Sequence, residues 1–268
     1  AKPAAPDKPP DLSKFPNLSG LVVVQDMAKL RLDDPADKPT DVIYATTDNS
    51  DTQFAILALW AAQRHDVPVD RTMRLIANRL QTSQNADGSW GYRYTNGGGQ
   101  GESAPMDCCG LLGLAVGHGI TRGGQVEDNA VNDPRIVNGF AALNKFVVAP
   151  AGRMNTLPPV NLYFLWALGR MGVLYDLQTI ADKDWYRWGA ETLVANQGID
   201  GSWPLGGPDG GAYPGATPTI NTCFALLFLR RTNLAADLTS ALKLNSDDLT
   251  KAIAAKVATP PPAPEPPA

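Results

Sequence analysis

The sequence is poor in the residues that crosslink chains and bind metals, and it has no excess of basic charge. Its 268 residues include three cysteines, and two of these, Cys108 and Cys109, are adjacent, so no disulfide framework is expected. No apolar run approaches the roughly 20 residues needed to span a membrane. A net charge of −4 argues against nucleic acid as a partner, since such binding depends on neutralising phosphates. The compartment stays open between the cytoplasm and, after removal of a signal peptide, the periplasm or exterior.

Proline and alanine dominate both ends of the chain. Residues 1–17 and 258–268 cannot bury apolar surface, and we expect them to form extended, disordered tails. Residues 18–47 are an N-terminal extension in which 22–32 favours a short helix. Residues 48–257 then form the folded domain.

Four apolar segments recur through this domain at intervals of 56, 54 and 60 residues. They read DTQFAILALW from Asp51, DCCGLLGLAV from Asp107, NLYFLWALGR from Asn161 and NTCFALLFLR from Asn221. None contains proline or alternates with a period of two, so each is expected to be a helix rather than a strand. The pattern predicts four helices that are buried on nearly every side, each opened by a side-chain cap.

Between these segments lie helices with apolar residues on one face only. Their apolar positions are Met73, Ile76 and Leu80; Ile136, Phe140, Leu143 and Val147; Trp185, Trp188, Thr192 and Leu193; and Leu249, Ile253 and Val257. The alternation predicts an all-α fold in two layers, with an inner ring covered on both sides and an outer ring with one wet face. The simplest closed solution is an α/α toroid of concentric inner and outer helices.

Two of the one-sided helices end in nearly the same phrase, QNADGSW and QGIDGSW. The phrase consists of Gln84, Gly88 and Trp90 in its first copy and of Gln197, Gly201 and Trp203 in its second. Its Asp-Gly step predicts a tight turn with a positive φ after the helix, from which the Trp returns against the neighbouring surface. Recurrence at matched repeat positions indicates a structural role for these residues.

This phrase resembles the QW motif of squalene-hopene cyclases and related terpene cyclases, whose α/α toroid is shared with protein prenyltransferase β subunits. The resemblance covers about residues 48–233, and the string from Tyr163 looks especially like bacterial squalene-cyclase-like proteins. It implies that the Gln and Trp residues tie adjacent repeats together and are not catalysts. A full toroid of this family has more helical pairs than the four recognisable here. We therefore expect a ring that is open, truncated, or completed by a second copy or another chain.

Class II terpene cyclases protonate an alkene with the central Asp of a D-x-D-D-T motif. The nearest match is DNSDT at 48–52, in which Ser50 stands where the donor should be. A hydroxyl is too weak an acid for this step, so Asp48 or Asp51 is better interpreted as a helix cap. The alternative is a divergent isoprenoid-processing enzyme in which Asp51 or Asp107 is the catalytic acid.

Protein prenyltransferases instead use zinc held by Asp, Cys and His. Asp107, Cys108 and Cys109 reproduce the D-x-C spacing, but His65 and His118 fall at the far ends of their helices. Zinc needs at least three protein ligands, so we expect no metal and no other cofactor, and we interpret the cysteines as packing residues.

Polar and aromatic residues are expected to gather at one mouth of the barrel, because the inner-helix starts and the glycine-rich loops share an end. Those residues are Asp48, Asp51, Glu102, Asp107 and Asp209, with Tyr92, Tyr94, Tyr163 and Tyr213. Carboxylates between aromatic walls would also suit carbohydrate chemistry, a third interpretation.

The loss of both family chemistries from a cyclase-like sequence favours a non-catalytic scaffold. We expect its central cavity or mouth to bind a hydrophobic small molecule or a peptide. The candidate ligand-binding residues are Asp48, Glu102, Cys109, Asn161, Tyr163, Tyr213 and Asn221.

Overall fold

The computed structural model describes residues 48–94, 97–98, 101, 103–121, 130–147, 161–204, 213, 215–233, 235–242 and 244–258. Over these residues the protein is mostly α-helical, as predicted, and none of the helices combines the length and apolarity needed to cross a membrane. The predicted tails at 1–17 and beyond Ala258, the extension at 18–47 and its helix at 22–32 lie outside the described residues.

The elements follow one another with short connections. They are α4 (Asn49–Gln63), α5 (Asp70–Thr82), α6 (Ala104–Thr121), a 3₁₀ turn η3 (Ala130–Asn132), α7 (Pro134–Asn144), α8 (Leu162–Leu174), β1 (Thr179–Ile180), β2 (Lys183–Asp184), α9 (Trp185–Asn196), α10 (Pro218–Leu229), α11 (Ala236–Leu242) and α12 (Ser246–Ala258). The two short strands pair antiparallel between α8 and α9.

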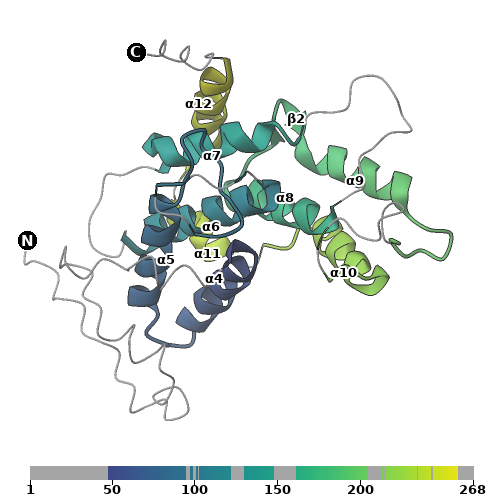
Figure 1. Ribbon diagram of the computed structural model, residues 1–268, viewed down its shortest axis with the longest axis horizontal. Helices are drawn as coiled ribbons and strands as arrows, with labels where there is room; N and C mark the ends of the chain where they lie inside the picture. Colours follow the sequence, from purple (N-terminus) through teal and green to yellow (C-terminus); the bar gives the residue numbers. More distant parts are fainter. Residues whose placement is uncertain are drawn as a thin grey trace, which may run out of the picture.

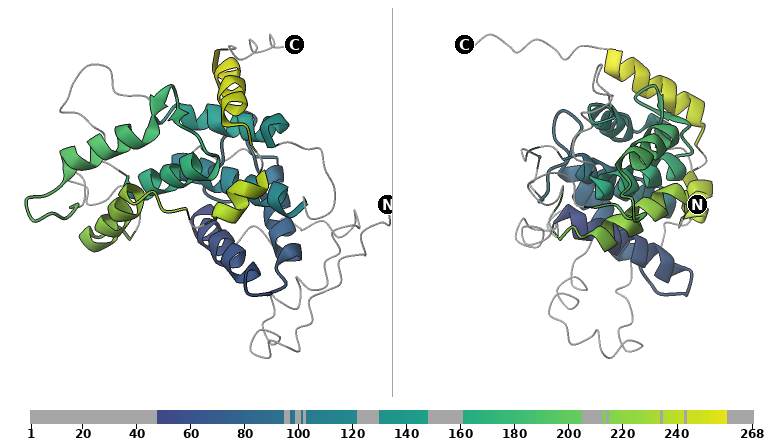
Figure 2. Two further views of the ribbon diagram at one scale, coloured as in Figure 1. Left: turned by 180° about the vertical axis from the view of Figure 1, so that it is seen from behind. Right: turned by 90° about the vertical axis from the view of Figure 1, so that its right-hand side faces the viewer.

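Helices α6 and α8 pack against each other in the middle of the molecule. Helices α4 and α5 lie on one side of this pair, and α9 and α10 lie on the other (Figures 1 and 2). Almost every residue of α8 is buried, whereas α5 and α7, which pack on α6, each bury a single face. The predicted difference between fully covered and one-sided helices therefore holds for the centre of the molecule.

The two terminal apolar helices, α4 and α10, are covered along one stripe only. The prediction that they are buried on nearly every side is wrong, because Phe54 on α4 and Ile220, Leu226 and Leu227 on α10 are exposed. Each packs on one central helix, α4 on α6 and α10 on α8. An apolar sequence makes a helix able to be buried, but a neighbour on its other face has to cover it.

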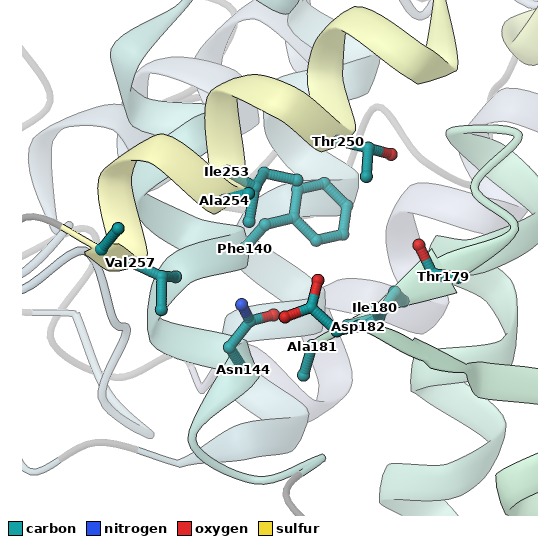
Figure 3. A pocket seen from close by; sticks show the side chains of 11 residues that line it. Phe140, Asn144, Thr179, Ile180, Ala181, Asp182, Thr250, Ile253, Ala254 and Val257 are labelled. Atoms are coloured by element: carbon teal, nitrogen blue, oxygen red, sulfur yellow. The ribbon is translucent and has the colours of Figure 1, made fainter.

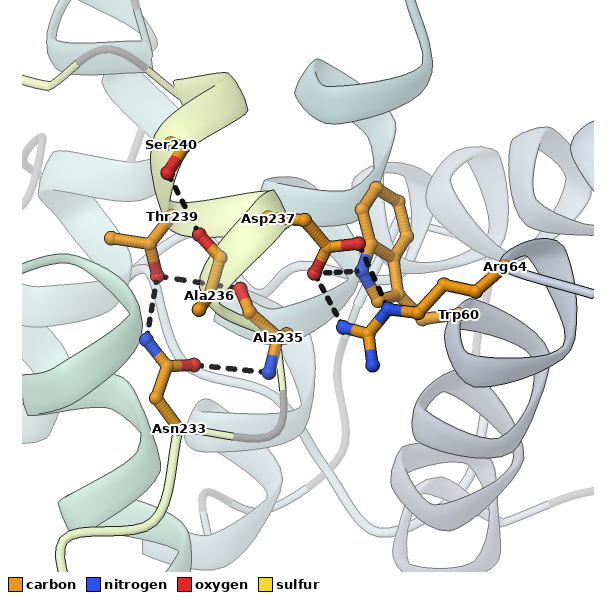
Figure 4. A network of polar contacts seen from close by, with 8 residues as sticks. All are labelled: Trp60, Arg64, Asn233, Ala235, Ala236, Asp237, Thr239 and Ser240. Carbon is orange, nitrogen blue, oxygen red and sulfur yellow. Dashed lines mark hydrogen bonds and ion pairs between the residues drawn. The ribbon is translucent and has the colours of Figure 1, made fainter.

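After α10 the chain turns back across the central pair. Helix α11 packs on α6 and α8, and α12 packs on α7 (Figure 2). The fourth one-sided helix is therefore not an outer partner of α10, as the alternation predicted. The returning segment is fixed to α4 by Asp237, whose carboxylate accepts hydrogen bonds from the Trp60 indole at 3.0 Å and from the Arg64 guanidinium (Figure 4).

Side-chain caps open three of the four apolar helices. Asp48 caps α4 and Asn161 caps α8, each accepting a hydrogen bond from a backbone N–H in the first turn, and these two caps were predicted. Thr217, not Asn221, caps α10. Asp107 is not a cap either, because α6 begins three residues before it and places it in the first turn.

Candidate functional site

A cavity of about 390 Å³ lies where α4, α6, α8 and α10 begin. It is lined by Ser50, Asp51, Phe54, Tyr92, Ser103, Pro105, Met106, Asn161, Tyr163, Tyr213, Gly215, Ile220 and Phe224. The starts of the four apolar helices and residues that follow the two repeated phrases thus meet at one mouth, as predicted. Four of the predicted site residues, Asp51, Asn161, Tyr163 and Tyr213, line the cavity.

Tyr163 is the centre of the aromatic wall. Its ring centroid lies 5.7 Å from that of Phe224, 5.8 Å from that of Tyr213 and 6.3 Å from that of Phe54. These separations lie in the usual range for packed aromatic pairs, so the rings form one continuous apolar surface. Tyr163 is only 7% exposed, which leaves little of it free to move.

The polar groups of the mouth are hydroxyls and one exposed carboxylate, that of Asp51. The Ser50 hydroxyl donates to Asp48 Oδ1 at 2.7 Å and lies 3.0 Å from the hydroxyl of Tyr92. Ser50, at the position of the cyclase proton donor, is thus a neutral hydroxyl on the cavity surface. The described lining residues include no Lys or Arg.

Asp48 lies beside the cavity as a helix cap. Burial works to raise its pKa, but hydrogen bonds from the backbone N–H of Asp51 and from Ser50 outweigh burial and hold the pKa below its usual value. A carboxyl group that is stabilised as its anion is a poor proton donor. The interpretation of Asp48 as a cap is confirmed.

Asn221 holds a cavity residue without lining the cavity itself. Its side-chain oxygen accepts a hydrogen bond from the Tyr213 hydroxyl at 2.6 Å, and its Nδ2 donates to the carbonyl of Pro204 at 3.3 Å. Asn221 is 4% exposed, and burial raises the pKa of Tyr213 to about 12. The Tyr213 hydroxyl therefore stays protonated and fixed in direction.

A chain of buried polar groups lies behind Tyr163. The guanidinium of Arg170 on α8 donates from Nη2 to Oε1 of Gln53 on α4, and Gln53 Nε2 donates to the Tyr163 hydroxyl. Arg170 also lies over the Trp166 ring, 3.9 Å from its centroid. The charge is thus separated from the cavity by one amide and one phenol.

Asp107 is fully buried and does not line this cavity. Its Oδ1 accepts a hydrogen bond from the backbone N–H of Trp90 at 2.7 Å, which fixes the end of the first phrase on α6. The structure therefore does not bring Asp107 together with Asp51 in the cavity wall.

The cysteines of α6 are buried within the helix packing. Cys109 is fully buried, and burial raises its pKa to about 12, against the opposing effect of Arg79 and Arg170. A thiol with this pKa is protonated at neutral pH, and a protonated thiol is a poor metal ligand. Among the residues that the structure describes, no three His, Cys, Asp or Glu side chains converge as a metal site would require.

Three other predicted mouth residues fall elsewhere. Tyr94 is 8% exposed and does not line the cavity; the Arg79 guanidinium lies 5.7 Å from its ring centroid. Glu102 and Asp209 lie outside the described residues.

The two repeated phrases fold into the same turn. Gln84 Nε2 donates to the carbonyl of Gly88 at 2.9 Å, and Gln197 Nε2 donates to that of Gly201 at 2.8 Å. The two glycines have φ values of 89° and 80°, which confirms the predicted turn.

The tryptophan of each phrase also returns to its own helix. The indole of Trp90 donates to the carbonyl of Leu80 at 2.8 Å, and that of Trp203 donates to the carbonyl of Leu193 at 2.9 Å. Both rings are buried, so each phrase ends its helix and fastens the following loop.

A second cavity of about 180 Å³ lies between α7, the β1–β2 turn and α12 (Figure 3). Phe140, Ile253 and Val257 provide much of its apolar wall, and Asp182 is the charged side chain among its described lining residues. It contains none of the predicted site residues and no group of convergent polar side chains. We therefore take the cavity at the helix starts as the candidate site.

The sequence predictions missed Gln53 and Arg170 behind the cavity and Phe54 and Phe224 in its wall. A signal for the first two was present, because Gln53 and Arg170 are polar residues within otherwise apolar helices. A buried polar side chain needs a partner, so two of them on neighbouring helices indicate a shared contact. Phe54 and Phe224 carried no such signal.

Comparisons with protein-family models, with curated proteins and with solved structures found no match to this chain.

Proposed function

We propose that the protein is an incomplete α/α toroid of the squalene-cyclase-like and prenyltransferase-like type, and that it binds an apolar small molecule, or an apolar peptide side chain, without catalysing a reaction. The observation that supports the binding function is the 390 Å³ cavity at the helix starts, with its aromatic wall around Tyr163. Concave, mostly apolar sites with a few fixed polar groups are the usual form of small-molecule sites.

The polar chemistry of the mouth supports a binder over a cyclase or a prenyltransferase. Ser50 supplies a hydroxyl where protonation of an alkene would need a strong acid, and Asp48 is held as an anion. A diphosphate group would be expected to meet Lys or Arg, and the described lining residues include neither.

The size of the cavity sets the expected affinity. An eight-carbon chain gains about 6 kcal/mol on leaving water, at about 0.8 kcal/mol per methylene. Association entropy offsets part of this gain, so dissociation constants in the micromolar to millimolar range are expected for such simple ligands.

The test compares two substitutions on the same helix. Phe224→Asp places a charge in the cavity wall, whereas Leu226→Asp places one on the exposed face of α10, where Leu226 is 56% exposed. Binding of 1-octanol, measured by isothermal titration calorimetry, should be lost in the first variant and kept in the second. Equal loss in both variants, with the helical circular dichroism unchanged, would place the ligand elsewhere.

The same protein should then be incubated with squalene and with polyprenyl diphosphates. The non-catalytic proposal expects no turnover. Turnover that disappears in Asp51→Ala would overturn it in favour of an isoprenoid-processing enzyme, since Asp51 is the ionisable side chain among the described polar groups of the cavity wall.

A further inference from the structure

Arg170 is a buried charge without a carboxylate beside it. It is 9% exposed, and among the described residues its hydrogen-bond acceptor is the amide oxygen of Gln53. The face of Trp166 supplies the other favourable contact, at 3.9 Å. Burial lowers the pKa of Arg170 to about 10, so the guanidinium remains charged at neutral pH. A charge buried in this way has to be oriented by neutral dipoles.

The chemistry of Arg170 fixes the direction of every hydrogen bond in the chain that follows. A guanidinium can only donate, so the oxygen of the Gln53 amide must face it. The Gln53 NH₂ group must then face Tyr163, where it donates to the phenolic oxygen. Tyr163 therefore spends an acceptor position on Gln53 and keeps its single proton for another partner.

The proton of Tyr163 has only a weak acceptor among the described residues. The carbonyl of Ser50 lies 3.4 Å from the phenolic oxygen, which exceeds the usual 2.5–3.0 Å of an O–H···O hydrogen bond. Burial raises the pKa of Tyr163, so the proton is retained at neutral pH. The side chain lines the cavity. A hydrogen bond received from a charged chain also makes the phenol a stronger donor.

We infer that the cavity selects ligands that carry an oxygen acceptor, such as a hydroxyl or a carboxylate, on an apolar body, and that the Tyr163 hydroxyl donates to this oxygen. Gln53 and Arg170 act as positioning residues that keep the Tyr163 proton directed at the ligand. The starts of four helices around the mouth add partial positive charge, which favours the same kind of group. This inference rests on the proposed binding function and specifies its ligand.

The selectivity is tested with four probes that share one apolar body: 1-octanol, octanoate, octylammonium and 1-chlorooctane. Calorimetry on the full chain should show 1-octanol binding about fivefold and octanoate about tenfold more tightly than 1-chlorooctane, as expected for one added hydrogen bond. Tyr163→Phe should bring these ratios to about one. Tyr92→Phe, which removes another phenol of the same cavity, is the matched control and should preserve the ratios.

Gln53→Glu is the sharpest variant because it keeps the shape of the side chain and reverses one hydrogen bond. Both carboxylate oxygens accept, so Arg170 gains a counterion while the Tyr163 proton is drawn to the new carboxylate. We expect the preference for 1-octanol over 1-chlorooctane to disappear while the affinity for 1-chlorooctane is unchanged. A purely structural role for Gln53 would alter both affinities together.

The outcomes separate the two proposals. If none of the four probes binds, the proposed binding function is wrong. If all bind equally, or if Tyr163→Phe and Gln53→Glu keep the wild-type preference, the binding function stands and the inference is wrong. If octylammonium binds most tightly, Asp51 recognises the head group and the inference is likewise overturned.

Discussion

The two copies of the repeated phrase have the same internal hydrogen bonds but different surroundings. In the first copy, Gln84 Nε2 also donates to the carbonyl of Arg135 on α7 at 2.9 Å, and a Cβ on Gly88 would lie 2.3 Å from the carbonyl oxygen of Asn138 on the same helix. In the second, the nearest atom to such a Cβ on Gly201 is Nε2 of Gln197, at 3.9 Å.

The comparison separates what the phrase determines from what its neighbours add. The turn, its glycine and the returning indole recur in both copies and are therefore local properties of the seven residues. The cover is supplied by a different helix, α7, which only the first copy has among the described residues. Val194 and Ile199 beside the second copy are correspondingly exposed. In the proposed toroid, a further helical pair would stand at this edge.

The largest effect that should distinguish the copies comes from removing their tryptophans. A Cβ on Gly110 of α6 or on Gly139 of α7 would lie within 3 Å of the Trp90 ring, so this indole fills a space that both helices leave for it. Trp90→Ala should lower the free energy of unfolding by about 3–5 kcal/mol. Trp203→Ala should lower it by about 2 kcal/mol less, since no helix like α7 covers it. Urea unfolding followed by circular dichroism measures both, and equal losses would contradict the comparison.

The glycines provide the next test, because they share one backbone strain and differ in space. Alanine at a positive φ is destabilising by about 1–2 kcal/mol, which should be the whole effect of Gly201→Ala. Gly88→Ala should add about 1–3 kcal/mol through its clash with Asn138. The difference between the two variants in urea unfolding reports the contact with α7. If they lose the same stability, α7 does not press on the first copy in solution.

The glutamines should show a smaller difference of the same sign. Gln84→Ala removes hydrogen bonds to its own turn and to α7, with an expected loss of about 1–2 kcal/mol. Gln197→Ala removes the bond to its own turn and should lose about 0.5–1 kcal/mol. Hydrogen exchange of the first turn of α7 should accelerate in the Gln84 variant alone, and unchanged exchange there would show that the tie to α7 is unimportant.

The smallest effect concerns pH and salt. The pKa of Asp87 is lowered, with burial opposed by hydrogen bonds from Ser89 and by Lys145 at 3.0 Å, and that of Asp200 is lowered by hydrogen bonds from Ser202. Each carboxylate therefore stabilises the fold above the unfolded-state pKa near 4, and this contribution is lost as the pH falls through the lower folded-state pKa.

Asp87→Asn and Asp200→Asn should both weaken the loss of stability on acidification, as measured by urea unfolding between pH 5 and pH 2. Because only Asp87 pairs with a cation among the described residues, the effect of Asp87→Asn should shrink with added salt, whereas that of Asp200→Asn should not. The same salt dependence for both would remove Lys145 from the explanation.

Local chemistry could be predicted from the sequence, whereas burial at the edges could not. The caps at Asp48 and Asn161 followed from short polar residues before apolar runs. The start of α10 was also readable, since Thr217 precedes a proline at the first helical position, but the repeat alignment drew attention to Asn221 instead. The α10 sequence is as apolar as that of α8, and no residue in it indicates that one face has no described neighbour.

The candidate site was predicted in its location and only partly in its residues. Helix starts and post-phrase loops meet because four helices run in matched order, and this order is visible in the repeat. The role of Asp107 could not be seen, because its partner is the backbone N–H of Trp90, which has no signature in the sequence. The β1–β2 turn was missed for a similar reason, since Ala181 and Asp182 adopt positive φ values without a glycine.

The contact of Trp60 and Arg64 with Asp237 joins residues that are 177 and 173 positions apart in the chain. During synthesis, α4 leaves the ribosome long before its partner carboxylate exists, so its C-terminal end must wait for nearly the whole domain. Contacts of such high sequence separation slow folding, because a long loop has to close before they form. The amino-terminal helix is therefore expected to be among the last parts of the molecule to reach its final packing.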